Sequence, residues 1–288
     1  MSKFYKIAGI IAGVAAGIGL VLCIIGVALG AKGYIAFTRN NGFEIIEGRD
    51  QWEYSNMDME EFSSIHIESN VAKVNIVPSN DGKYGAKCVH AGDESSIRFE
   101  VKDVKLSILD SGDKIRFSLD IFSWFDSVDN SITIYVPKSV TVDGIYISSD
   151  VGEVCVEDIT GAKNFEIGTD VGDLEITGGS YDYVNIAASV GDVNIDNITV
   201  NNTFSLYSDV GDVEVEGSFD CQVGIETNVG DIDVDTTQSE GSYAYSVSTQ
   251  AGDIDFYGRE IDGTGTLTGG TGEKSMIIKT KLGDIEVK

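Results

Sequence analysis

The sequence predicts an all-β fold, a right-handed parallel β-solenoid with coils of about 20 residues, preceded by one transmembrane helix. Three observations support this fold class: a short motif recurs seven times, apolar residues alternate within each copy, and one glycine interrupts the alternation. The steps between these glycines are 20, 19, 20, 19, 22 and 31 residues. In repeat architectures with such a period, each unit buries its apolar face against its neighbours. The seven glycines are Gly152, Gly172, Gly191, Gly211, Gly230, Gly252 and Gly283.

The residues around each glycine fall into columns. Positions seven and five before the glycine are aliphatic or aromatic, as in Phe165 and Ile167, and positions two and four after it are again apolar. Apolar residues two apart indicate a strand with one buried face. Counted from the glycine, the inward-facing residues stand at odd-numbered positions before it and at even-numbered positions after it. We therefore expect the chain to turn a corner at the glycine, which tolerates a positive φ. The inward set then includes the residue directly before the glycine, which is mostly valine: Val151, Val171, Val190, Val210 and Val229.

The amino terminus predicts a membrane anchor at residues 1–32. Ile7 to Ala31 are 25 residues without a charge, a helix of about 37 Å, which exceeds a hydrocarbon core of about 30 Å. A cleaved signal peptide is the alternative, although its apolar core is shorter. We expect a cell-membrane localisation, single-pass, with an extracellular carboxyl-terminal domain, because long domains translocate largely regardless of charge. The GxxxG spacings of Gly9, Gly13 and Gly17 could support an oligomer through this helix.

Four segments are expected: the anchor at 1–32, a polar spacer at 33–61, divergent first coils with inserted hairpins at 62–144, and the Gly-Asp repeat at 145–288. The divergent part begins with a copy of the repeat after Phe62, in which Ala72 and Lys73 replace the glycine and the aspartate. The aromatic residues at 122–125 are expected to cap the first coil, because uncapped strand edges invite aggregation. Three cysteines outside the anchor, Cys88, Cys155 and Cys221, are expected to be unpaired thiols, with Cys155 exposed.

With the repeat and the entry coil in view, the chain resembles the bacterial "putative adhesin" β-strand-repeat family, a domain of unknown function. The resemblance covers residues 62 to 288 and rests on the motif [DNS]-V-G-D-[VIL]-x-[VI], which recurs in register. It implies a β-solenoid and residence in the cell envelope. It implies no catalytic residues.

Composition narrows the function. A formal net charge of -27 argues against nucleic-acid partners, so we expect the membrane, envelope polymers or another surface protein as partners. Between Ser139 and Gly258 the one basic residue is Lys163, and the two histidines, His66 and His90, lie outside the repeats. We therefore expect a non-catalytic, membrane-anchored envelope protein that displays an acidic solenoid for binding, adhesion or scaffolding. The alternatives are a polysaccharide-active β-helix enzyme, a calcium β-roll and a sensory domain.

The acidic residue directly after each glycine forms the one candidate site. In a solenoid, equivalent positions lie about 4.8 Å apart, so the carboxylates would form a ladder. One interpretation is a row of solvated turn residues that keep the protein soluble. The other is a row of divalent cations, Ca²⁺ or Mg²⁺, held by oxygens of adjacent coils. The residues of this candidate metal ladder are Asp173, Asp192, Asp212, Asp231 and Asp253. No other cofactor is expected.

Overall fold

The computed structural model describes residues 33–38, 42–47, 51–91, 97–110, 117–118 and 130–288. The chain divides into two units, one of Met1–Asp50 with Ile115–Ser127 and one of Gln51–Lys114 with Val128–Lys288. In the smaller unit, β1 (Gly33–Thr38) pairs antiparallel with β2 (Gly42–Glu47) and with β9 (Phe117–Ser118). The segment expected to be a polar spacer thus contains strands. The aromatic residues at 122–125 lie outside the described residues.

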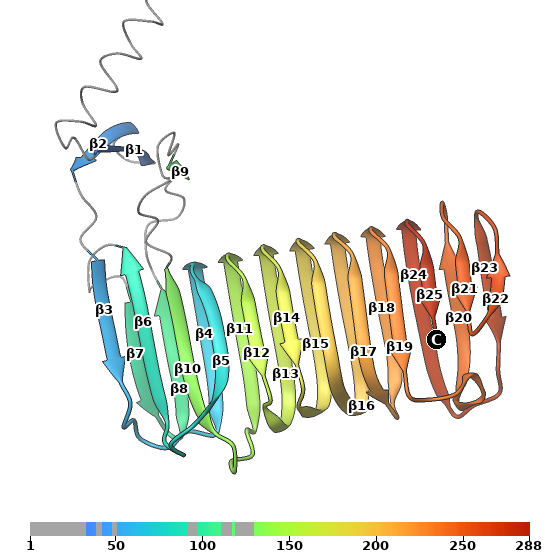
Figure 1. The fold of residues 1–288 in the computed structure, drawn as a ribbon, viewed down its shortest axis with the longest axis horizontal. Coiled ribbons are helices and arrows are strands. Elements are labelled where there is room, and N and C mark those ends of the chain that lie inside the picture. The colour runs from blue at the N-terminus through green and yellow to red at the C-terminus, as the bar shows by residue number, and fades with distance from the viewer. Residues whose placement is uncertain (1–32, 39–41, 48–50, 92–96, 111–116, 119–129) are drawn as a thin grey trace, which may run out of the picture. The chain divides into compact units, whose positions relative to one another are not determined.

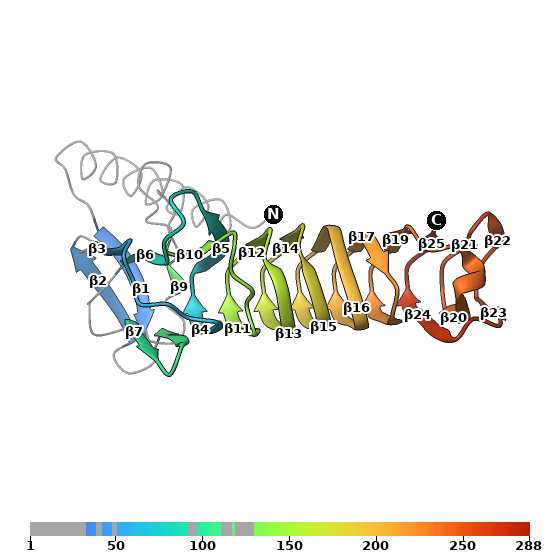
Figure 2. The ribbon, with the colours of Figure 1, turned by 90° about the horizontal axis from the view of Figure 1, so that it is seen from below.

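The larger unit is an all-β stack of coils, joined in one 22-stranded sheet (Figure 1). Each coil contributes one strand before the glycine corner and one after it, and successive coils lie side by side in both views (Figure 2). The strands before the corner are β4 (Ser64–Val71), β11 (Gly144–Val151), β13 (Thr160–Val171), β15 (Ser180–Val190), β16 (Val193–Val210), β18 (Gln222–Val229), β20 (Tyr243–Thr249) and β24 (Lys274–Leu282). Those after it are β5 (Lys73–Ser79), β12 (Val154–Glu157), β14 (Leu174–Thr177), the start of β16, β17 (Val213–Phe219), β19 (Ile232–Thr236), β21 (Ile254–Phe256) and β25 (Ile285–Val287).

The coils stack in parallel with the register that the repeat predicts. Ile167 pairs with Ile186, and Ile186 pairs with Leu206, which pairs in turn with Ile225. The entry coil joins the same register, since Ile65 pairs with Ile145. The two apolar columns before the corner are buried in every coil, with exposed fractions of at most 5%. The parallel β-solenoid is confirmed, whereas its right hand stays a prediction.

The seventh copy of the repeat does not follow the sixth in space. Strand β24 pairs in parallel with β18 on one side and with β20 on the other. The last coil therefore lies between the coils of Gly230 and Gly252. A 3-10 turn, η2 (Glu240–Ser242), precedes β20 at this end.

Both ends of the stack change from parallel to antiparallel pairing. At the carboxyl-terminal end, β23 (Gly265–Gly269) pairs antiparallel with β20, and β22 (Arg259–Ile261) with β21. At the other end, β8 (Lys105–Asp110) and β10 (Ser131–Pro137) extend the stack in parallel. Beyond them, β7 (Ile97–Lys102), β6 (Gly85–Ala91) and β3 (Gln51–Asn56) pair antiparallel. These strands cover the edges of the last parallel coils, which would otherwise be open to a further chain.

The localisation predicted from the sequence, a single-pass membrane protein with an extracellular carboxyl-terminal domain, is contradicted. Within the part of the chain that the structure describes, no helix is long and apolar enough to cross a membrane. Residues 1–32, where the sequence predicts the anchor, lie outside the described residues.

Candidate functional site along the glycine corners

The corner glycines are required both by backbone conformation and by close packing. Gly172, Gly191, Gly211 and Gly230 have φ values between +138° and +146°, a region that residues with a side chain rarely adopt. A Cβ at Gly211 would lie 2.0 Å from the carbonyl oxygen of Gly191. The entry coil accepts Ala72 because that residue is outside the positive-φ region. The prediction of equivalent, strained corners is confirmed for these four glycines.

The structure brings the predicted aspartates together as a hydrogen-bonded ladder. The Oδ1 of Asp173 accepts the backbone N–H of Asp192 at 3.0 Å, and the same contact joins Asp192 to Asp212 and Asp212 to Asp231 at 2.9 Å. Because the last coil is inserted, Asp231 contacts Asp284 rather than Asp253. Asp284 then accepts the N–H of Asp253 at 2.7 Å. The column of acidic residues after the glycines includes Asp284, but the sequence does not predict its place between Asp231 and Asp253.

These contacts explain how the like charges are tolerated. Each aspartate of the ladder before Asp253 offers one oxygen to a backbone N–H of the next coil, and such charge-assisted bonds are stronger than neutral ones. The side chains themselves are exposed, so water solvates the rest of each carboxylate. Backbone donors and solvent thus offset the repulsion along the row, and the cation ladder stays a prediction.

A second cluster ends the ladder near the entry coil. The ligand atoms of Glu153, Cys155 and Glu175 lie within 4.8 Å of one another. The Cys155 thiol donates to Glu153 Oε1 at 3.0 Å, and Lys73 Nζ lies 2.9 Å from the same oxygen. Burial raises the pKa of the Cys155 thiol to about 12, and the contact with Glu153 adds to this shift. The thiol is thus protonated at neutral pH and is a donor within the cluster.

The expected exposure of Cys155 is wrong, since 6% of it is exposed. It lies between its register partners Asn75 and Glu175 on the two adjacent coils. All three described cysteines are free and buried, so the expectation of unpaired thiols is confirmed.

The histidines differ from each other. His66 stacks on Tyr146 with ring centroids 4.5 Å apart and contacts Glu68 Oε1 at 3.0 Å. His90 is buried, with 7% of it exposed, and lies 3.8 Å from the Asp110 carboxylate. Neither arrangement places a nucleophile or a free carboxylate pair at an open cleft.

The valines directly before the corner glycines face solvent, contrary to the sequence prediction. Their exposed fractions, with those of Val71 and Leu282 in the same column, lie between 40% and 54%. Each is the register partner of the next, from Val71 through Val229 to Leu282. Adjacent strands lie about 4.8 Å apart, so the seven residues form an apolar row about 29 Å long. We call this set the valine row: Val71, Val151, Val171, Val190, Val210, Val229 and Leu282.

Carboxylates flank the valine row on both sides. On one side stands the aspartate ladder. On the other side, the residue before the row is an aspartate in three coils, Asp150, Asp170 and Asp209, and a lysine, Lys281, in the last coil. The backbone under the row is fixed, because Gly172 N–H donates to the Val190 carbonyl at 2.9 Å and Gly191 N–H to the Val210 carbonyl at 3.0 Å. The corner edge is thus a rigid apolar row with the aspartate ladder on one side and three carboxylates on the other.

Comparison with protein families matches residues 62–260 to the Toastrack DUF4097 model. The chain belongs to the Toastrack DUF4097 family. This confirms the resemblance drawn from the motif and agrees with the stacked coils. The family description assigns no activity, so the Toastrack match identifies the fold and leaves the function to the surface features of this chain.

Solved structures with similar folds have low sequence identity to this Toastrack chain. A "putative adhesin" from Bacteroides fragilis is 18% identical, covers 84% of this chain and 98% of its own, and has a TM-score of 0.43. A "putative cell adhesion protein" from Clostridium sporogenes is 17% identical over 83% and 99%, with a TM-score of 0.35. A "putative lipid binding protein" from Parabacteroides distasonis is 15% identical over 83% and 97%, with a TM-score of 0.36. These likenesses carry no argument about function. No curated protein matches the chain.

Two sets of surface residues escaped the sequence analysis of this Toastrack domain. The valine row was assigned to the core, because its position has the parity of the buried columns. Lys279 and Lys281 in the last copy were also overlooked, although they are basic residues in columns that elsewhere hold mostly small, acidic or amide side chains. Comparing the copies column by column for such exceptions would have found the lysines. No comparable sequence signal marks the valines as exposed.

Proposed function

We propose that this chain is a non-catalytic binding protein that holds a basic, amphipathic helix of a partner protein along its glycine corners. The observation that carries the proposal is the valine row, a continuous exposed apolar strip. Soluble proteins rarely leave long contiguous apolar surface uncovered, and such surface marks interaction sites. The acidic columns beside it select the charge of the partner.

The spacing of the row favours a helix over an extended strand. Valines on adjacent coils repeat about every 4.8 Å, close to the rise of about 5.4 Å per helical turn. Alternate residues of an extended strand would repeat at about 6.6 Å and lose register within a few coils. A helix with one apolar residue per turn, flanked by Lys and Arg, would place apolar groups on valines and ammonium groups on the carboxylates.

The charge also disfavours other occupants. A second copy of this chain would bring two pairs of acidic columns together, on molecules that each carry a formal charge of -27. An anionic lipid surface would be repelled in the same way. A basic partner gains attraction at long range and apolar burial at contact.

The test uses a labelled helical peptide with Leu at one position per turn and Lys on both sides, followed by fluorescence anisotropy. We expect it to bind, and a peptide with Glu in place of Lys not to bind. Changing Val190→Ser and Val210→Ser together should weaken binding about tenfold, because the contact loses two half-exposed apolar groups. The control pair Tyr183→Ser and Ile277→Ser removes apolar side chains of similar exposure, 51% and 43%, away from the row. Binding that the valine changes leave intact would overturn the proposal.

A further inference from the structure

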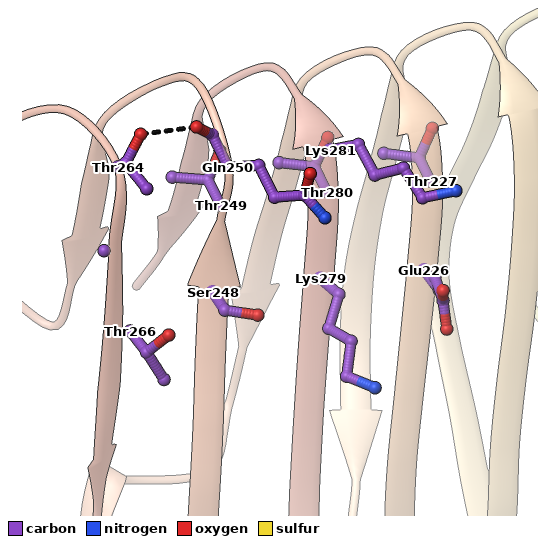
Figure 3. A pocket seen from close by; sticks show the side chains of 11 residues that line it. Glu226, Thr227, Ser248, Thr249, Gln250, Thr264, Thr266, Lys279, Thr280 and Lys281 are labelled. Carbon is purple, nitrogen blue, oxygen red and sulfur yellow. Dashed lines mark hydrogen bonds between the residues drawn. The ribbon is translucent and has the colours of Figure 1, made fainter.

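The inserted last coil creates a groove on the outer face near the carboxyl-terminal end of the stack (Figure 3). Its volume is about 350 Å³. Four adjacent strands, β18, β24, β20 and β23, each contribute one side chain to a row across it. The row consists of Glu226, Lys279, Ser248 and Thr266, which are register partners in that order.

The base of the groove is held in place by buried hydroxyl groups. Thr280 Oγ1 donates to the Gly230 carbonyl at 3.2 Å, and Thr249 Oγ1 donates to the Gly283 carbonyl at 3.0 Å. The Thr264 hydroxyl donates to the Gln250 carbonyl across the rim, a contact drawn in Figure 3. The polar groups that face the opening, among them Ser248 and Thr266, therefore stand on a fixed backbone.

Lys279 and Lys281 break the charge pattern of the repeat at this groove. Lys281 occupies the column of Asp150, Asp170 and Asp209, and Lys279 occupies the column of Ser148, Gly168 and Ala187. Both side chains are exposed, and within the described residues neither makes an ion pair. Other basic residues nearby are paired: Arg259 with Glu240, Lys274 with Asp220, and Lys288 with Asp233 and Glu286.

Two unpaired ammonium groups beside hydroxyl and amide groups fit a ligand with both negative charge and hydroxyl groups. We propose that this groove binds a short acidic saccharide, with a carboxylate held between Lys279 and Lys281. Ser248, Thr266 and the Gln250 side chain hydrogen-bond the sugar hydroxyls. Glu226 lies on the strand beside Lys279, where it accepts from a sugar hydroxyl and repels a carboxylate, so the ligand carboxylate stays on the side of Lys279 that faces Ser248. This site borders the end of the valine row, because Lys281 directly precedes Leu282, and it takes a ligand of the opposite charge.

The binding experiment uses trigalacturonate as the probe and maltotriose as a neutral sugar of the same length, measured by isothermal titration calorimetry on the full chain. We expect trigalacturonate to bind and maltotriose to bind at least about tenfold more weakly, since it lacks the charged contact. Lys279→Gln with Lys281→Gln should reduce the affinity for trigalacturonate by about tenfold or more. Lys87→Gln with Lys138→Gln is the matched control, because it removes the same charge from exposed lysines elsewhere.

Further measurements separate a saccharide site from a simple anion site. Ser248→Ala with Thr266→Ala should reduce the affinity for trigalacturonate about threefold, because these hydroxyls face the ligand. The thermal melting point of the protein should stay unchanged. Inorganic sulfate at the same charge concentration should compete poorly. Equal affinity in the groove double-lysine variant and its control, absence of trigalacturonate binding to a folded chain, or full competition by sulfate would each overturn the proposal.

Discussion

The apolar residues and strand edges of the central coils are covered differently from those at the two ends of the stack. In the centre, identical columns lie against each other in parallel, and each coil buries its apolar residues on both neighbours. At the ends there is no further coil, and antiparallel strands cover the last parallel ones. The centre is therefore set by repetition, whereas each end needs residues of its own.

Buried and exposed positions of the coils also differ in what they contribute: the buried columns stabilise the fold, and the exposed residues make contacts with other groups. The buried columns vary little between coils, and a change in one affects every neighbour. The surface residues that differ between coils, such as Lys73 at one end and Lys279 at the other, are free to differ because they touch solvent. Residues that depart from the repeat consequently make specific contacts. Lys73, which replaces the usual aspartate, pairs with Glu153 at 2.9 Å.

The largest expected effect is a charge in the central core. Ile186→Asp places a carboxylate at a position with 1% exposure, between Ile167 and Leu206. We expect the free energy of unfolding to fall by about 4 kcal/mol or more, with several coils unfolding together. The control Ala187→Asp puts the same charge on the exposed face of the same strand and should change stability by less than about 1 kcal/mol. Urea unfolding followed by circular dichroism measures both, and similar losses would contradict the inward columns.

The next effect tests the corner. Gly211→Val forces a β-branched residue to a φ of +145°, with its Cβ 2.0 Å from the Gly191 carbonyl oxygen. We expect a loss of about 3 kcal/mol or more in the free energy of unfolding. Gly168→Val is the matched change, because a Cβ there meets nothing within 4 Å. That variant should be neutral or slightly stabilised in the same urea titration, as valine suits a strand. Equal stability of the two variants would show that the corner is not strained.

Much of the central fold follows from the sequence, because a period of two in apolar residues reports directly on which side of a strand is buried. The columns of Phe165 and Ile167 are buried as predicted. The same rule gives a wrong prediction for the valine row. The residue directly before the glycine is two positions from a buried residue, so the alternation predicts that it is buried, but the chain has already begun to turn there. Parity describes a straight strand and does not extend into a corner.

The order of the last coils could not be predicted for a different reason. A column pattern records which residues are equivalent but not which coils are neighbours. The step of 31 residues between Gly252 and Gly283 allows β22 and β23 to fold back, and β24 then pairs with β18. For the acidic column after the glycines, the sequence therefore predicts which residues are equivalent, but not the contact between Asp231 and Asp284.

A smaller effect compares two neighbouring threonines at the boundary between the centre and the end. Thr227 and Thr280 are register partners and both are buried. Thr227 Oγ1 has no hydrogen-bond partner among the residues that the structure describes, whereas Thr280 Oγ1 donates to the Gly230 carbonyl at 3.2 Å. Thr227→Val should therefore stabilise the fold by about 1 kcal/mol, and Thr280→Val should destabilise it by about 1 kcal/mol. Thermal unfolding of the two single variants checks the opposite signs, and a shared sign would contradict this assignment of the hydroxyl contacts.

The smallest effect concerns the aspartate ladder of the central coils. Replacing Asp192, Asp212 and Asp231 by Asn keeps an oxygen that accepts the N–H of the next coil but removes the charge. Like charges about 4.8 Å apart repel by about 0.9 kcal/mol in water, so the triple variant should melt at a slightly higher temperature at low ionic strength. The difference should vanish in concentrated sodium chloride, which screens exposed charges. Calcium and sodium salts at matched ionic strength should stabilise the unchanged chain equally, because both screen the exposed carboxylates to the same extent. A rise in melting temperature that is specific to calcium, and is lost in the Asn variant, would instead establish bound cations along the ladder.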